Sequence, residues 1–147
     1  EWEWGYREND VLGGPDPYSA SKGAAEVAIR SYVKSYFSSE ENAIRIASAR
    51  AGNVIGGGDW ATNRIIPDCV QSWSKNEKVE LRNPYSTRPW QHVLEPLSGC
   101  LLLGQKLIEG KSEFAEAYNL GPLVQEEMTV QDVLEELKPS TSLLKIG

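Results

Sequence analysis

The feature that most constrains the fold is an apolar strand pattern that runs directly into a glycine-rich loop. Residues 43–50 read "AIRIASAR", and their alternating isoleucines and alanines are typical of a buried strand. "AGNVIGGGDW" follows without a break and supplies flexible turn residues. Ligands of open α/β sheets bind at the carboxyl ends of strands, where such loops lie. The segment therefore predicts an α/β protein with a ligand site just after residue 50.

Helix and strand patterns alternate along the rest of the chain. Asp16 before Pro17 is a typical helix start, because aspartate caps the first turn and proline lacks only an N–H that has no partner there. Thr129 is the expected N-cap of the last helix. The order helix, strand, helix, strand, helix, strand, helix indicates α/β architecture. The predicted helices span 17–38, 64–75, 92–110 and 129–138, and the predicted strands span 43–50, 78–82 and 116–121.

Composition narrows the classes of function. A net charge of −6 argues against a nucleic-acid or anionic-membrane partner. No apolar run reaches the roughly 18 residues of a membrane span, and the acidic, aromatic start is unlike a secretory signal. Cys69 and Cys100 are too few and too far apart for a disulfide scaffold or a metal site. We therefore expect reduced thiols in a cytoplasmic protein. His92 is the only histidine, which excludes a mechanism that needs two within this chain.

Two residues at the start of the first predicted helix have the spacing of a catalytic pair. Tyr18 and Lys22 stand at i and i+4, on one helix face. The lysine ammonium and the positive potential of a helix N-terminus both favour a tyrosinate that can act as a base. The neighbouring residues are small, so a cofactor or another helix can approach closely. The same spacing also occurs by chance on ordinary helices, and spacing alone does not separate the two interpretations.

Three arginines, Arg64, Arg82 and Arg88, lie in or beside predicted loops. Guanidinium groups bind pyrophosphate with two hydrogen bonds apiece. For any single arginine a solvated surface position is the simpler interpretation. Arg88, however, stands between a proline turn and Trp90, which favours a held side chain.

Other polar residues of the loops have two interpretations each. Asn53 offers an amide to a phosphate or a sugar hydroxyl, and a turn-forming asparagine accounts for it equally well. Asn119 has the same alternative. Asp59 and Trp60 are candidates to contact a base, although Trp60 as a cap on its loop is an equal alternative. His92 is more simply a helix-start histidine than a catalyst.

Four segments carry a family resemblance when taken together: "DPYSASKGAAE", "RAGNVIGGGDW", "RIIPDCV" and "RPWQHVLEPLSGCLLL". They resemble the extended short-chain dehydrogenase/reductases, over residues 1 to about 122. The Y-x-x-x-K spacing is shared by the superfamily, whereas "GNVIGGGDW" and "RPWQHVLEPL" are similar to its members that act on a CDP-linked sugar. The resemblance implies a partial Rossmann-like, doubly wound sheet over about 15–60 and largely substrate-binding lobe over 61–147.

The resemblance also implies NAD as cofactor, CDP-glucose as substrate and a homodimer or higher homo-oligomer that uses the helix of Tyr18. Tyr18 would take the proton of the sugar C4 hydroxyl, and Lys22 would favour its tyrosinate and bond the nicotinamide ribose. Water would then leave from C5 and C6. The implied nicotinamide contacts are Ala51 and Gly52, and the implied substrate contacts are Asn53, Arg64, Ile65, Ile66, Pro67, Glu80, Leu81, Arg82, Arg88 and Asn119.

The chain also departs from the family pattern. It has no glycine-rich NAD loop upstream of Tyr18, and "GGGDW" lacks the spacing of a dinucleotide fingerprint. The strand-end cluster of Ser or Thr, Asp and Lys or Glu, which would serve the elimination, is missing too. We therefore expect a middle-to-late fragment that is inactive alone. Two alternatives stay open: a nucleotide-sugar-binding module without catalysis, or another nucleotide-sugar epimerase or dehydratase.

Overall fold

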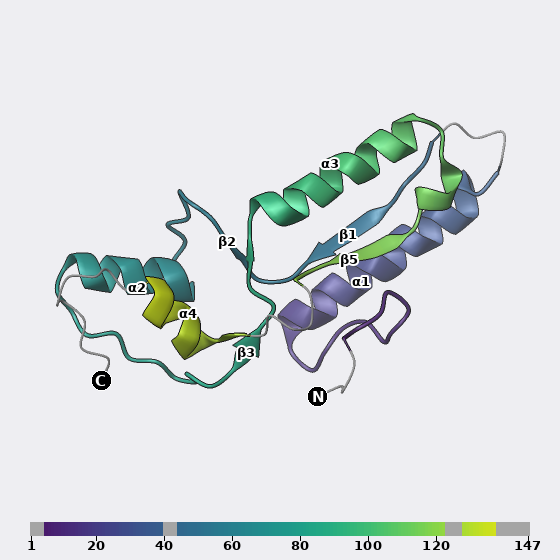
Figure 1. The fold of residues 1–147 in the computed structure, drawn as a ribbon. Coiled ribbons are helices and arrows are strands. Elements are labelled where there is room, and N and C mark those ends of the chain that lie inside the picture. Colours follow the sequence, from purple (N-terminus) through teal and green to yellow (C-terminus); the bar gives the residue numbers. More distant parts are fainter. Residues whose placement is uncertain (1–4, 40–43, 123–127, 138–147) are drawn as a thin grey trace. The chain divides into compact units, whose positions relative to one another are not determined.

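The computed structural model describes residues 5–39, 44–122 and 128–137, and the chain divides into two compact units (Figure 1). The first unit comprises Glu1–Ala51 and Pro96–Leu120, and the second comprises Gly52–Glu95 and Gly121–Gly147. The sequence predicted two consecutive regions that meet near residue 60, whereas each compact unit of the structure combines two separate stretches of the chain. Among the described helices, none has the length and apolar character that a bilayer span requires.

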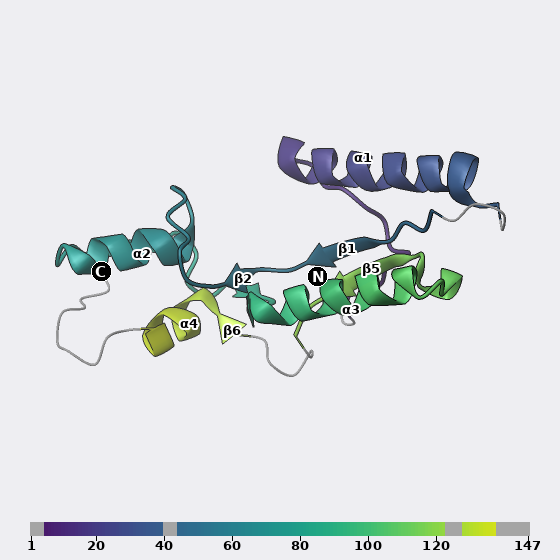
Figure 2. The ribbon, with the colours of Figure 1, turned by 90° about the horizontal axis from the view of Figure 1, so that it is seen from above.

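Two parallel strands with a helix on each face make up the first unit. Strand β1 (Ser48–Ala51) pairs with β5 (Ala117–Leu120) in parallel. Figure 2 shows α1 (Pro17–Tyr32) and α3 (Leu94–Ile108) on opposite faces of this pair. Parallel neighbours need a long crossover connection, and α3 is the helix that precedes β5. The arrangement confirms the predicted α/β class and the predicted strand at 116–121.

Specific contacts hold the two helices to the strands. On the α1 side, the Ser48 hydroxyl of β1 donates to Glu26 Oε2 at 2.9 Å in a partly buried hydrogen bond. On the α3 side, a Cβ added at Gly99 would lie 3.2 Å from both methyl groups of Leu120. The glycine therefore lets α3 approach β5 closely.

Helix α1 begins as predicted. Asp16 Oδ1 accepts the Ser19 N–H at 3.0 Å, and Pro17 occupies the first helical position. The Ser19 hydroxyl also donates to Asp16, and this bond, together with the Ser19 N–H, holds the pKa of that carboxyl below its usual value. The helix continues into a π-helical turn at Val33–Phe37. The predicted helix over 17–38 is thus confirmed, with a change of winding near its end.

Helix α3 confirms the prediction over 92–110, with Pro96 buried in its first turn. His92 Nδ1 accepts the backbone N–H of Leu94 at 3.3 Å. This contact agrees with the interpretation of His92 as a helix-start histidine.

The second unit has a small apolar core between helices. Cys69, Val130 and Leu134 form this core, and six partly buried side chains pack against it: Ile65, Ile66, Trp73, Val79, Leu81 and Trp90. Two short ladders complete the unit. Its elements are β2 (Val54–Ile55) parallel to β4 (Gln91–His92), β3 (Thr87–Arg88) antiparallel to β6 (Met128–Thr129), and the helices α2 (Ile65–Ser74) and α4 (Val130–Leu137).

The predicted strand at 78–82 is wrong. The segment has no strand, and only Val79 forms an isolated bridge. Its alternating pattern has another cause, because Val79 and Leu81 both pack on the apolar core while Glu80 stays exposed. The strand predicted at 43–50 is confirmed only from Ser48 onward, and residue 43 lies outside the described residues. Both helices of this unit confirm the predictions over 64–75 and 129–138 within the described residues.

Helix α4 starts with a reciprocal cap that offers a stability test. Thr129 Oγ1 accepts the Asp132 N–H at 3.1 Å, and Asp132 Oδ2 accepts the Thr129 N–H at 2.9 Å. The Thr129 hydroxyl and N–H both lower the pKa of the Asp132 carboxyl. We expect Thr129→Ala to lower the free energy of unfolding by about 1 kcal/mol at neutral pH.

The acid dependence of this cap has a definite sign. Because the pKa of Asp132 is lower in the folded protein, its charged carboxylate stabilises the fold fully at pH values above the ordinary pKa of 3.8. This stabilisation is lost as the pH falls through the lowered pKa. Urea unfolding of the two proteins at neutral and acidic pH measures the effect. The difference between them should shrink in acid, and a difference that is constant with pH would contradict the role of Asp132.

Candidate active site

The structure brings Tyr18 and Lys22 together on an exposed part of α1. The Lys22 ammonium lies 5.7 Å from the centroid of the Tyr18 ring, within the range of a cation–π contact. The Tyr18 side chain is 70% exposed, so a substrate can reach it. The Ser21 hydroxyl donates to the Tyr18 carbonyl at 2.7 Å. The pair is therefore preassembled, and its catalytic role stays a prediction.

The four predicted cofactor contacts have features that fit NAD. In the described part of the chain Lys22 forms no salt bridge, so its ammonium is available to a ribose hydroxyl. Ala51 ends β1, and Gly52 follows it; both are exposed. A Cβ at Gly52 would lie 2.7 Å from Pro89 Cγ. Only glycine allows that approach, and it leaves bare backbone at the end of β1, where α/β folds bind ligands.

A cavity of about 880 Å³ in the second unit gathers the predicted substrate contacts. This volume lies within the roughly 300–1,000 Å³ of sites for small molecules. It is formed by the loop after β2, the start of α2, the segment 78–83 and β3. Every predicted substrate contact except Asn119 lines it: Asn53, Arg64, Ile65, Ile66, Pro67, Glu80, Leu81, Arg82 and Arg88. Residues scattered over 36 positions of sequence thus share one surface.

The charges around this cavity suit an anionic ligand. Basic side chains outnumber acidic ones in the lining, which contains Arg64, Lys78, Arg82 and Arg88 against Asp59, Asp68 and Glu80. Within the described ranges none of the three arginines forms a salt bridge with a carboxylate. Arg88 Nη1 donates to the carbonyl of the adjacent Thr87 at 2.7 Å, in an exposed hydrogen bond. In a chain of net charge −6, this local excess favours a phosphate group.

Several residues of the cavity wall were not predicted as contacts, among them Asn63, Lys78 and Trp90. Asn63 has a φ of 62°, a left-handed conformation that asparagine adopts more readily than most residues. Lys78 adds a cation, and Trp90 lies two residues after Arg88. The Trp90 Nε1 is buried and has no hydrogen-bond partner among the described residues. The places of Asn63 beside Arg64 and of Trp90 near Arg88 were the sequence features that pointed to them.

Asp59 and Trp60 also line the cavity. Asp59 Oδ1 accepts the Ala61 N–H at 3.0 Å, which closes a tight turn. The Trp60 side chain is 68% exposed. An exposed ring at the edge of the cavity is available to stack on a base, so this interpretation stays open.

Asn119 belongs to the first unit and makes contacts of another kind. Its side-chain amide donates to the Tyr6 carbonyl at 3.0 Å, and its backbone N–H donates to Glu8 Oε1 at 2.8 Å. The predicted contact of Asn119 with substrate stays a prediction. Its observed partners are in the segment that precedes α1.

The cysteines and acidic residues form no metal centre in the part of the chain that the structure describes. Cys69 and Cys100 are both free thiols. Burial, with a smaller contribution from Asp68, raises the pKa of Cys69 to about 11. Cys69 is therefore a neutral thiol of the apolar core rather than a nucleophile.

Most of this chain is similar in sequence to known proteins. Residues 7–121 match the NAD dependent epimerase/dehydratase family. The chain is 49% identical over 140 residues to the CDP-glucose 4,6-dehydratase of Salmonella typhimurium strain LT2. The match covers 93% of this chain and 39% of that protein, so the chain spans about two fifths of the relative's length.

Solved structures share its fold at low sequence identity. The dTDP-glucose 4,6-dehydratase from Bacillus anthracis, in complex with NAD, matches with a TM-score of 0.69 and 22% identity, over 100% of this chain and 45% of that one. The UDP-glucuronic acid 4-epimerase from Bacillus cereus matches with a TM-score of 0.68 and 18% identity, over 98% and 44% of the two chains. These matches confirm the predicted Rossmann-like α/β class.

Proposed function

Because this chain belongs to the NAD dependent epimerase/dehydratase family, we propose that it is a segment of a CDP-glucose 4,6-dehydratase. One observation carries the proposal: all but one of the residues expected to contact CDP-glucose line a single cavity in the second unit, and basic residues slightly outnumber acidic ones in its lining. The 49% identity to the Salmonella typhimurium enzyme supports the same substrate and reaction. The product would be CDP-4-dehydro-6-deoxyglucose, a precursor for deoxysugar synthesis in the cytoplasm, such as that of lipopolysaccharide O-antigen.

Tyr18 and Lys22 have separate tasks in this proposal. The Tyr18 oxygen takes the proton of the sugar C4 hydroxyl as general base. The Lys22 ammonium, one turn away, offsets the negative charge of the tyrosinate and donates to a ribose hydroxyl of the cofactor. Bound NAD supplies a reversible acceptor for the hydride that leaves C4 and returns to C6 after the elimination. The ketone formed at C4 makes the C5 proton acidic, which permits the loss of water across C5 and C6. Hydride at C6 and a proton at C5 then give the 6-deoxy product.

Arg88 is proposed to clamp the pyrophosphate of the substrate, which gives a binding test. We expect Arg88→Ala, in the full-length enzyme that carries this segment, to raise the Kd for CDP-glucose about 10- to 100-fold, because a charged hydrogen bond is lost. Titration calorimetry with CDP and CDP-glucose measures it. Lys75→Ala is the matched control, since Lys75 follows α2 and does not line the cavity. Equal weakening by both substitutions would argue against a specific clamp.

The cavity lies wholly within the second unit. This location supports a second candidate function. A nucleotide-sugar-binding module without catalysis needs only this cavity. Calorimetry of the 147-residue chain with CDP and CDP-glucose tests it, and no binding at millimolar ligand would exclude it. Turnover of CDP-, dTDP-, GDP- and UDP-sugars by the full-length enzyme separates the proposed substrate from those of related epimerases and dehydratases.

A homodimer through α1 is part of the proposal. Large apolar or aromatic side chains three residues apart share an exposed face of this helix, among them Ile29 at 39% and Tyr32 at 61%. Such a face supports contact with a second helix. Sedimentation of the full-length enzyme measures the oligomeric state directly.

A further inference from the structure

The segment of residues 5–13, which we name the entry segment, leads into α1 and is tied to the ends of both strands of the first unit. Glu8 Oε1 accepts the backbone N–H of Asn119, at β5, at 2.8 Å. The Glu8 carbonyl accepts Arg50 Nη2, from β1, at 3.2 Å. The Asn119 amide donates to the Tyr6 carbonyl at 3.0 Å. Glu8 is thus the one residue of this segment that bonds to both strands in the described structure.

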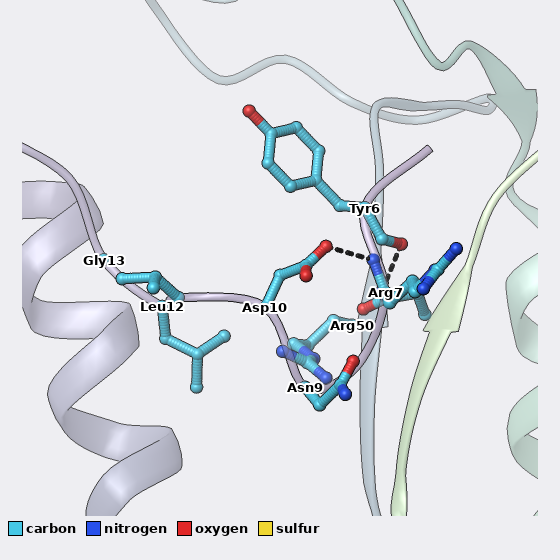
Figure 3. Close-up of a pocket in the computed structure, with 9 residues that line it drawn as sticks. Tyr6, Arg7, Asn9, Asp10, Leu12, Gly13 and Arg50 are labelled. Carbon is cyan, nitrogen blue, oxygen red and sulfur yellow. Dashed lines mark hydrogen bonds between the residues drawn. The ribbon is translucent and has the colours of Figure 1, made fainter. Parts of the chain in front are cut away.

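Polar bonds tie the entry segment to the two strands beside an open space. A cavity of about 550 Å³ is lined by this segment together with Arg50 and Asn119. Figure 3 shows Tyr6, Arg7, Asp10 and Arg50 around it, with Gly13 where the segment reaches α1. The hydrogen bonds of Arg50 and Asn119 join the segment to the strands at this space.

The carboxylate of Glu8 is held in its charged form. The Asn119 N–H is the largest cause of its lowered pKa, followed by the N–H of Glu8 itself, and the Arg50 cation adds to the effect. Hydrogen bonds to a charged acceptor are about twice as strong as neutral ones. Both bonds that join Glu8 to the strands therefore involve a charged group, the Glu8 carboxylate in one and the Arg50 guanidinium in the other.

The entry segment contacts α1 directly, backbone against backbone. A Cβ added at Gly23 would lie 2.9 Å from both Cα and N of Gly13. Gly23 is the buried residue of α1 and is adjacent to Lys22. Gly13 itself has a φ of 94°, which favours glycine. Because no side chain separates the backbones at Gly13 and Gly23, a displacement of the entry segment at Gly13 should move α1 at Gly23.

From these contacts we propose that Glu8 is a positioning residue for the Tyr18–Lys22 pair. Its carboxylate fixes the entry segment to β5, its backbone carbonyl fixes the segment to β1, and the Gly13–Gly23 contact then fixes the first turns of α1. The inference rests on the proposed dehydratase function, because it assigns to Glu8 the placement of that reaction's base. Glu8 itself touches neither substrate nor cofactor.

The test compares Glu8→Ala and Glu8→Gln in the full-length enzyme, assayed with CDP-glucose and NAD. We expect Glu8→Ala to lower kcat by on the order of 10- to 100-fold, since displacements of about 1 Å have such effects on a reacting group. The KM for CDP-glucose should change little, because all the proposed substrate contacts except Asn119 belong to the second unit. Glu8→Gln keeps an oxygen acceptor for the Asn119 N–H and should recover most of the kcat.

Hydrogen exchange gives a readout that does not depend on turnover. Amides of residues 5–24 should exchange faster in Glu8→Ala, while those of α4 should not change. Glu113→Ala, an exposed glutamate of the same unit, is the matched control. If Glu8→Ala does not fold, Glu8→Asp replaces it, because the shorter side chain withdraws the carboxylate and should lower kcat with little change in Tm.

The outcomes separate this inference from the proposed function. An unchanged kcat in a folded Glu8→Ala or Glu8→Asp variant overturns the positioning role, as does an equal rise in KM. Tyr18→Phe is measured in parallel. If Tyr18→Phe is inactive while the Glu8 variants keep full kcat, only the role of Glu8 fails. If Tyr18→Phe keeps full activity, the proposed base is wrong and the fault lies with the proposed function.

Discussion

Tyr18→Phe is expected to lower kcat for CDP-glucose by on the order of 10²–10⁴-fold in the full-length enzyme, because the substitution removes the oxygen proposed to accept the proton of the C4 hydroxyl. The ring stays in place, and the Lys22 ammonium keeps its contact with the ring face. Substrate affinity should therefore change little. Steady-state turnover and calorimetry with CDP-glucose together distinguish a lost base from a lost binding contact.

Tyr85→Phe is the matched control for this substitution. Tyr85 is 78% exposed in the second unit and does not line the cavity, so its hydroxyl should be dispensable. Normal turnover by Tyr18→Phe would show that another group takes the proton. A loss of CDP-glucose affinity as large as the loss of kcat would instead place Tyr18 among the binding contacts.

Leu134→Ala is expected to cost about 2–5 kcal/mol of unfolding free energy, the range for leucine truncation in a packed core. Leu134 is 2% exposed and packs with Cys69 and Val130 in the small core of the second unit. A core with so few members has little capacity to close around a new cavity. Urea unfolding of the 147-residue chain, followed by tryptophan fluorescence, reports on this unit because Trp73 and Trp90 pack against its core.

Leu137→Ala provides the comparison within the same helix. Leu137 is 40% exposed, so its truncation should cost well under half as much as that of Leu134. The helix propensity change is the same for both substitutions and cancels in the comparison. Equal losses would mean that α4 contributes through its helicity rather than through the packed core.

The sequence predicted best those features that depend on neighbouring residues. Asp16 and Pro17 mark the start of α1 because a cap and its partner are only three residues apart. The pair of Tyr18 and Lys22 was predictable for the same reason, since one helical turn fixes their spacing. The residues around the cavity of the second unit were predictable only through motifs, because no local pattern states that Asn53 and Arg88 share a wall.

The features that the sequence did not reveal depend on partners far along the chain. Alternation at 78–82 correctly marked two partly buried side chains, but it did not show whether a neighbouring strand was present. The contacts of Asn119 with Glu8 and Tyr6 join residues 111 and 113 positions apart. Turn formation and ligand contact were both reasonable expectations for an asparagine before a glycine and a proline, and neither indicated a bond to the entry segment.

The discontinuity of the two units has a consequence for the order of events during synthesis. Within the described residues, β1 pairs only with β5, and the bond from Asn119 to Glu8 cannot form until residue 119 is made. Residues 52–95, most of the second unit, leave the ribosome in between. Helix α1 with Tyr18 and Lys22 is therefore made before the entry segment can bond to β5. A nascent chain halted between the two events would carry this tyrosine and lysine on a helix whose entry segment is not yet tied to β5.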